Sequence, residues 1–299
     1  MTQFKALLKR NIKLFFKDKG MFITSLITPM ILLVLYATFL GKVYRDSFLQ
    51  NLPEGVTMAE KLIDGLVAGQ LMSSILAVSC VTVAFCSNLL MVQDKVNGSI
   101  RDFTITPVKP SVMALAYYVS SLIVTLIICY CATFLCLGYV AICGWYMSLT
   151  DVVLLIIDVF VLVLFGTALS SVIHFFLSSQ GQMSAVGTIV SSVYGFVCGA
   201  YMPISQFPEG LQKVLSFLPG TYGTSLLRNH SMQGVFKEML NQNYPEEVVE
   251  SMKIIVDCNI SVFGTNVSIP VMYIILVGTI VLLITAYILL NLFKKKRTK

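Results

Sequence analysis

The stretch IPVMYIILVGTIVLLITAYILLNLF, residues 269–293, contains no charged residue and runs directly into Lys294-Lys295-Lys296-Arg297. An uncharged apolar run of this length is long enough to cross the hydrocarbon core of a bilayer as a helix. A basic cluster at the end of such a helix marks the cytoplasmic side. The stretch therefore predicts a membrane protein and orients its last crossing.

The composition of the whole chain agrees with this prediction. Hydrophobic residues make up 57% of the sequence and charged residues only 12%, and the mean hydropathy is +0.84. These values lie outside the range of soluble globular domains. The formal net charge of +6 reflects cytoplasmic lysines and arginines in such a protein, so we expect no nucleic-acid partner.

Charged residues and turn residues divide the chain into six predicted transmembrane helices. We expect these helices at about residues 20–40, 68–92, 111–142, 152–177, 183–202 and 269–293. The 299 residues then form a single all-α transmembrane domain with outer loops at 41–67 and 203–268. Of the 21 Lys and Arg residues, 14 fall in the segments 1–19, 93–110 and 294–299. This distribution predicts that both termini are cytoplasmic.

Residues 1–19 have the pattern of a basic amphipathic helix. Apolar side chains fall near one stripe, and lysines repeat every four residues on another. Such a helix lies in the headgroup region, held by apolar burial and by attraction to anionic lipid. The alternative is an ordinary solvated helix that leads into the first crossing.

The cytoplasmic segment 93–108, QDKVNGSIRDFTITPV, gathers charges of both signs after a long apolar run. Gly98 can end one helical turn, and Pro107 and Pro110 bracket the entry to the next crossing. The pattern fits a short amphipathic docking helix, and it fits a solvated loop that reverses the chain equally well.

The segment 201–222 predicts a short helix on the outer side. Leu211, Val214, Leu215 and Leu218 have the spacing of one helical face. Pro208 suits the start of this helix, and Pro219 begins the turn that ends it. The helix is too short to span the bilayer, so we expect an interfacial or re-entrant element with its apolar face protected from water.

Two ionisable residues lie inside the predicted crossings, where charge is costly. Asp158 lies roughly 10 Å from the outer end of its crossing. It could bind a cationic substrate, pair with a neighbouring helix, or form a neutral structural hydrogen bond. His174 lies near the cytoplasmic end and suits a headgroup or interhelical contact better than a proton relay. The eight cysteines show no metal-ligand spacing, so no metal site is expected.

Taken together, these segments resemble the permease subunit of type-2 ATP-binding-cassette exporters. The resemblance rests on six crossings, the basic N-terminal helix, D-K-x-x-G-S-I-R-D after the second crossing, and M-P-I-x-x-F-P followed by L-P-x-x-Y after the fifth. It implies that the first motif contains the coupling helix that contacts the ATPase, through Asp94, Lys95, Gly98, Ser99, Arg101 and Asp102. It implies that the second motif forms paired re-entrant helices, an outer gate of Pro203, Phe207, Pro208, Leu211, Leu215, Leu218, Pro219 and Tyr222. The chain departs from the family pattern at Asn97, where Glu is common.

The same resemblance implies partners that the chain does not contain. No G-x-x-x-x-G-K-[ST] sequence is present, so the chain itself has no phosphate-binding loop and is not expected to be an enzyme. Two copies of a separate ATPase, which bind ATP and Mg²⁺, and a second permease are implied, in a bacterial plasma membrane. Gly195 and Gly199 form a G-x-x-x-G pattern that would suit packing against that second permease, although the spacing also arises by chance.

Three functions remain open at this level. The first is export of a hydrophobic or amphiphilic compound, such as a drug, antibiotic, lipid or peptide, as in multidrug efflux. The second is export of undecaprenyl-linked polysaccharide or a teichoic-acid-type polymer. The third is an ion-coupled carrier or sensor without an ATPase. Long outer segments at 41–67 and 203–268 favour the first, because they would cap an exit that a long polymer needs open.

Overall fold

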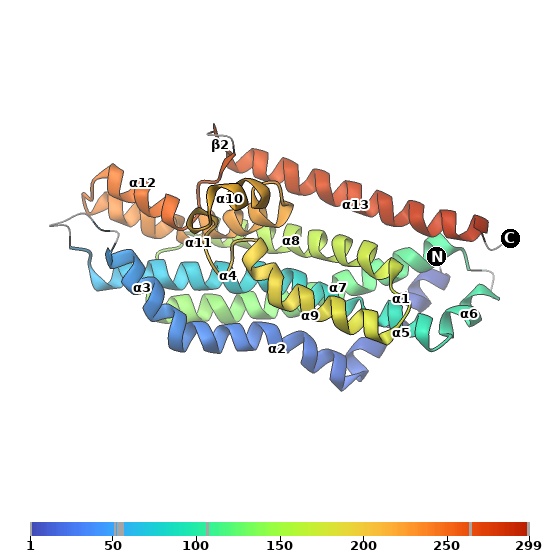
Figure 1. Ribbon diagram of the computed structural model, residues 1–299. Helices are drawn as coiled ribbons and strands as arrows, with labels where there is room; N and C mark the ends of the chain where they lie inside the picture. The colour runs from blue at the N-terminus through green and yellow to red at the C-terminus, as the bar shows by residue number, and fades with distance from the viewer. Residues whose placement is uncertain (1, 51, 53–56, 106–107, 263–264, 298–299) are drawn as a thin grey trace.

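The fold is an elongated bundle of roughly parallel and antiparallel helices (Figure 1). The computed structural model describes residues 2–50, 52, 57–105, 108–262 and 265–297, apart from the side chains of 28, 36, 37, 101, 104 and 294–297. Its elements, in chain order, are α1 (Thr2–Lys17), α2 (Lys19–Leu35), the π-helical turn η1 (Tyr36–Leu40), α3 (Gly41–Gln50), α4 (Glu60–Ser87), α5 (Leu89–Val96), α6 (Ser99–Thr104), α7 (Pro110–Cys143), α8 (Leu149–Phe176), α9 (Gln180–Val197), the 3-10 turn η2 (Ile204–Gln206), α10 (Glu209–Leu215), α11 (Pro219–Asn241), α12 (Glu246–Ile255), β1 (Ser261–Val262), β2 (Thr265–Asn266) and α13 (Ile269–Arg297).

Five helical segments of the described chain are long and apolar enough to cross a membrane. They are Lys19–Gln50, Glu60–Val96, Pro110–Cys143, Leu149–Phe176 and Ile269–Phe293. The predicted all-α membrane architecture is confirmed at this level. The predicted crossing at 183–202 corresponds to α9, which has only 18 residues. At 1.5 Å per residue, α9 is about 27 Å long, and glutamines and serines reduce its hydropathy, so its crossing stays a prediction.

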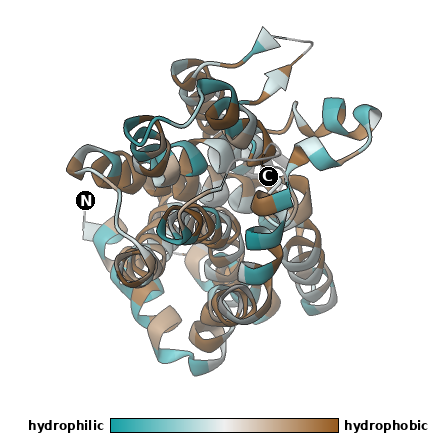
Figure 2. Ribbon diagram, turned by 90° about the vertical axis from the view of Figure 1, so that its left-hand side faces the viewer, coloured by the Kyte–Doolittle hydropathy of each residue, from teal (hydrophilic) through white to brown (hydrophobic). Residues whose placement is uncertain are grey.

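Helix α4 is the centre of the bundle. It packs against α2, α7, α8 and α11, and nearly all of its side chains are buried. A helix that is apolar on every side is stable only when other elements surround it. Close approach to α11 depends on Gly69, where an added Cβ would lie 2.6 Å from the Met232 side chain. Figure 2 looks along the bundle and shows many of its helices nearly end-on, with hydrophobic residues in brown on most of them.

The two expected outer loops are largely helical. In the segment expected as a loop at 41–67, α3 extends the first apolar helix to Gln50. In the segment expected at 203–268, α10, α11, α12 and a two-residue antiparallel hairpin of β1 and β2 follow one another. Helix α11 is mostly buried against α4, α8 and α13. Its glycines, serines and threonines give no clear apolar stripe, so burial by its neighbours, rather than sequence periodicity, makes it a core helix.

A buried ion pair fastens α11 to the segments around it. Arg228 is 1% exposed, and its Nη1 lies 3.3 Å from Oδ2 of Asp257, which follows α12. Arg228 Nη2 also donates to the carbonyl oxygen of Gly199 at 2.5 Å. Asp257 accepts from the backbone N–H groups of Ile204 and Ser205. The pair therefore holds together α11, the end of α12 and the turn that follows α9.

Replacing Arg228 with Met should lower the free energy of unfolding by about 3–5 kcal/mol, because it leaves Asp257 buried without its cation. The measurement is equilibrium unfolding of the purified chain in detergent. The control is Arg45→Met, since Arg45 is partly exposed and pairs with Asp64 at 2.8 Å, a type of pair that contributes about 0–1 kcal/mol. Equal losses in the two variants would contradict a stabilising role for the buried pair.

Candidate functional site

The break between α4 and α5 is fixed by the buried side chain of Asn88. Its Nδ2 lies 3.0 Å from Oγ of both Ser170 and Ser171 on α8, and its Oδ1 accepts from Ser121 Oγ of α7 at 2.8 Å. A buried amide with several partners fixes the relative position of the helices that supply them. Asn88 therefore sets the direction in which α5 leaves the bundle.

Asp94, predicted to contact an ATPase, instead lies inside this end of the bundle. It is 5% exposed and accepts a two-pronged hydrogen bond from Arg10 of α1, with distances of 2.7 and 2.9 Å. Tyr117 of α7 donates to the same carboxylate at 2.6 Å. The hydrogen bond to Asp94 raises the pKa of the Arg10 guanidinium above its ordinary value. This paired geometry is the strongest form of an Arg–carboxylate contact, so Asp94 joins α5 to α1 and α7.

Lys95 also faces the protein. Its Nζ donates to the carbonyl oxygens of His174, Phe175 and Leu177 at 2.8, 2.8 and 3.0 Å. These are the carbonyls of the last turn of α8 and of its C-cap Leu177, whose own N–H already donates to His174. A lysine at a helix C-terminus also complements the helix dipole. Lys95 therefore caps α8 and holds α5 against it.

The exposed part of this segment is its tip. Gly98, with a φ of +79°, turns the chain from α5 into α6, and Ser99 is half-buried. Val96, Asn97, Asp102 and Ile105 are exposed, Ile105 at 86%. The side chain of Arg101 lies outside the described residues. Contact of the segment with an ATPase stays a prediction, and the residues that the structure leaves available for it are those of the tip.

A cavity of about 600 Å³ lies between α2, α4, α5 and α9. Its lining combines apolar side chains, hydroxyls, amides and one carboxylate: Asp18, Gly20, Met21, Thr24, Thr82, Phe85, Cys86, Leu89, Gln93, His174, Gln180, Met183, Ser184, Gly187, Thr188, Ser191 and Ser192. Ten of these seventeen residues carry a hydrogen-bonding side chain, and Met21, Phe85, Leu89 and Met183 supply apolar contacts, so the lining offers both kinds of contact to a small molecule. The cavity adjoins α5, so a compound bound there would touch the helix that leads to the tip.

His174 borders this cavity from α8. Its Nδ1 lies 2.8 Å from the carbonyl oxygen of Ser170, and its ring lies 5.4 Å from that of Phe85. The residue is 1% exposed. Its contact with Phe85 of α4 is interhelical, one of the two kinds of contact, headgroup or interhelical, that were expected for His174.

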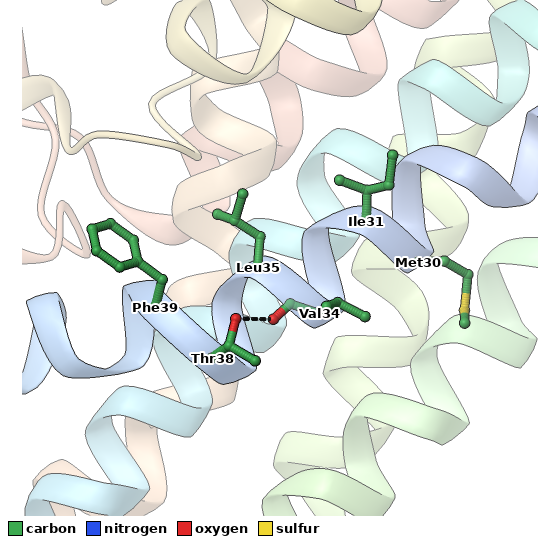
Figure 3. Close-up of a pocket in the computed structure, with 6 residues that line it drawn as sticks. All are labelled: Met30, Ile31, Val34, Leu35, Thr38 and Phe39. Carbon is green, nitrogen blue, oxygen red and sulfur yellow. Dashed lines mark hydrogen bonds between the residues drawn. The ribbon is translucent and has the colours of Figure 1, made fainter.

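A second hollow, of about 550 Å³, lies along the outward face of α2 and η1. Figure 3 shows the side chains that line it: Met30, Ile31, Val34, Leu35, Thr38 and Phe39. The hydroxyl of Thr38 donates to the carbonyl oxygen of Val34 in the same helix at 2.7 Å. Because this hydroxyl is already bonded within the helix, the lining offers mainly apolar contacts. It suits lipid chains or another apolar helix better than a polar ligand.

Asp158 is paired with two neighbouring helices. His230 of α11 places Nδ1 2.5 Å from Asp158 Oδ2, and Tyr273 of α13 donates to Oδ1. Asp158 is 1% exposed. Of the three roles left open for Asp158, these contacts favour interhelical pairing. His230 could not be identified as a partner from the sequence, because it lay within the loop expected at 203–268.

The outer segment only partly matches its predicted geometry. Pro203 and Phe207 flank η2, and Pro208 precedes α10. Leu215 is buried and Leu218 half-buried, but Leu211 and Val214 are 42% and 59% exposed. The expected second short helix is the 23-residue α11, which begins at Pro219. Tyr222 ties the two helices together, because its hydroxyl donates to the carbonyl oxygen of Ser216 at 2.6 Å.

Comparison with known families decides what this arrangement is. A sequence model of the ABC-2 type transporter family matches residues 2–230, from α1 into α11. This chain belongs to the ABC-2 type transporter family. Members of this family are multi-pass membrane permeases that work with an ATPase component. The matched part of the permease contains the cavity, the segment α5–α6 and Asp158. No curated protein matches the chain.

The described part of the permease holds no group of three His, Cys, Asp or Glu side chains that could bind a metal ion.

Replacing Asp94 with Ala should loosen α1, because Arg10 and Tyr117 both lose their acceptor. Hydrogen bonds to charged groups contribute about 1.5–3 kcal/mol, so amide hydrogen exchange in α1 should quicken markedly. The control is Asp102→Ala, since Asp102 is exposed at the tip and should leave exchange in α1 unchanged. Unaltered protection of α1 in the Asp94 variant would contradict this role.

Proposed function

We propose that the permease is the membrane half of an ATP-driven exporter of hydrophobic or amphiphilic compounds, such as drugs, antibiotics, lipids or peptides. The compound would enter from the cytoplasm or the inner leaflet, and a separate ATPase that binds ATP and Mg²⁺ would supply the energy. The observation that carries this proposal is the cavity between α2, α4, α5 and α9. Its apolar side chains suit the body of an amphiphile, and its hydroxyls and amides suit a polar end.

The exposed face of α9 supports assembly with a second permease. Helix α9 packs mainly on α4 and α5. Its exposed Ser184, Thr188 and Ser192 line the open cavity, and its exposed Ile189, Val193 and Phe196 lie outside the cavity lining. Small and hydroxyl-bearing residues suit close contact between transmembrane helices better than contact with lipid tails. A second copy or a sister permease would cover this face and enlarge the cavity, because a two-fold interface uses the same surface twice.

This assembly gives the membrane arrangement of the proposal. Helix α9 would be the fifth of six crossings, and both termini would be cytoplasmic in a bacterial plasma membrane. Two ATPase copies would dock at the tips of the two α5–α6 segments. In each permease Asp94 and Lys95 would transmit the motion of the tip, since they join α5 to α1, α7 and α8 rather than meeting the ATPase directly.

The outer side of the permease favours small compounds over polymers. Helices α10, α11 and α12 gather at the outer end of the bundle (Figure 1), and the buried pair of Arg228 and Asp257 holds them to the turn after α9. An undecaprenyl-linked polysaccharide would need an open continuous exit there. The segment 203–222 would instead act as a gate that opens briefly for each amphiphile.

The cavity can be tested with a variant that fills it. Cys86→Trp should abolish the stimulation of ATP hydrolysis by hydrophobic dyes such as Hoechst 33342, because Cys86 lines the cavity from α4 and the indole would occupy the binding volume. Basal hydrolysis by the permease, reconstituted in vesicles with its ATPase, should remain. The control is Ile274→Trp on α13, where the side chain is 70% exposed. A normal dye response in Cys86→Trp would contradict the assignment of the cavity.

Docking at the tip can be tested separately. The double variant Asp102→Lys with Ile105→Asp reverses one charge and places another on the most exposed apolar residue of the segment. We expect the ATPase to be lost on copurification, while the permease stays inserted and folded. The control is Glu209→Lys on α10, an exposed acid at the other end of the bundle. Full retention of the ATPase by the tip variant would show that docking occurs elsewhere.

A further inference from the structure

The face of α1 that turns away from the bundle carries a regular row of lysines. Lys5, Lys9, Lys13 and Lys17, here called the lysine row, are all exposed. With 3.6 residues per turn, a four-residue repeat spreads these side chains over roughly 120° of the helix surface. The opposite face of α1 packs on α7 and α2, with Phe15 at 1% exposure.

The lysine row is not neutralised within the chain. Among the residues that the structure describes, no ion pair involves any of its four lysines. The nearby carboxylates have other partners: Asp94 binds Arg10, and Asp18 accepts from the backbone N–H of Met21 at 3.1 Å. Four positive charges therefore remain on one surface of α1.

An exposed aromatic side chain places this surface at the membrane boundary. Phe16 is 40% exposed and, by helical geometry, lies on the same side of α1 as the lysine row. Its ring centroid lies 5.8 Å from that of Phe22, in α2, whose apolar segment begins at Lys19. Lysines beside an exposed Phe, at the start of a crossing, form the pattern of a helix seated among lipid headgroups.

We propose that the lysine row is a binding surface for anionic phospholipid headgroups in the leaflet where α1 lies. An anionic leaflet attracts basic segments beside a crossing, and a flexible lysine reaches toward phosphate as a point charge. Arg10, on the same helix, holds Asp94 of α5. Headgroups bound to the lysine row therefore also help to hold α1 in its contact with α5. This inference is independent of the transported compound and of the ATPase.

The test measures which lipid lies beside Phe16 in the intact chain. Phe16→Trp, made in a Trp145→Phe background, places the single tryptophan on this face of α1. The protein is reconstituted into vesicles that contain brominated phosphatidylglycerol or brominated phosphatidylcholine, and quenching of tryptophan fluorescence is compared. We expect the binding constant for phosphatidylglycerol to exceed that for phosphatidylcholine on the order of fivefold. This is the factor that one lysine near an anionic surface supplies.

The lysines are then removed and replaced. Changing the four lysines of the row to Gln should bring the relative constant close to one, and changing them to Arg should retain the preference. The matched control should leave the lipid preference unaltered. It changes to Gln four exposed lysines of the outer region: Lys42, Lys61, Lys213 and Lys237. The native Trp145, 47% exposed between α7 and α8, lies roughly 35 Å along α7 from the α1 contact. Each set of lysine substitutions is also made in the native background, with Phe16 and Trp145 both intact, where the fluorescence of Trp145 reports the fold.

Two results would overturn the proposal. One is an equal quenching by the two lipids in the protein with its lysines intact. The other is a preference for phosphatidylglycerol that persists in the Gln variant while Trp145 reports an unchanged fold. If the Gln variant instead loses the ATPase on copurification and shows no change in lipid preference, the lysine row binds protein rather than lipid. That outcome also rejects the proposal.

Discussion

The structure depends on one constraint: an ion buried in a bundle that spans a bilayer must have a partner, because burial without one is costly. Among the described residues, three buried pairs satisfy it, each across different helices. Arg10 binds Asp94, His230 binds Asp158, and Arg228 binds Asp257. Each pair joins segments that lie far apart in the sequence, so the ions decide which helices meet as much as the apolar side chains do.

In the segment α5–α6, this constraint distinguishes residues that hold the segment to the bundle from residues that stay exposed for contact with a partner. The charged residues that the motif brings to attention, Asp94 and Lys95, are used within the permease, on Arg10 and on the end of α8. The residues left exposed at the tip are fewer and include the apolar Ile105. A motif read from sequence therefore mixes residues that position a contact surface with residues that form it. Only their burial distinguishes the two kinds.

The closely packed helices differ in a similar way from α9, which borders the cavity. Helices α4, α7 and α8 form a packed core that offers little space for a compound, whereas α9 packs mainly on α4 and α5 and leaves a cavity beside them. The hydroxyl-bearing residues of α9 line this cavity, whereas its exposed Ile189, Val193 and Phe196 are apolar. Membership of the ABC-2 type transporter family and this incomplete cover of α9 support the same proposal, a permease that works with a second one.

The sequence alone determined the membrane class, the positions of five apolar helices and the family, because uncharged runs such as 269–293 satisfy the bilayer without reference to any neighbour. It also predicted the breaks at Gly98 and Pro208, where local backbone chemistry suffices. It missed α11 as a core helix and His230 as the partner of Asp158. Both depend on contacts with α4, α8 and α13, and no local pattern records which distant helices will surround a segment of mixed polarity. The tertiary structure decided these, since burial and ion pairing are properties of the assembled bundle.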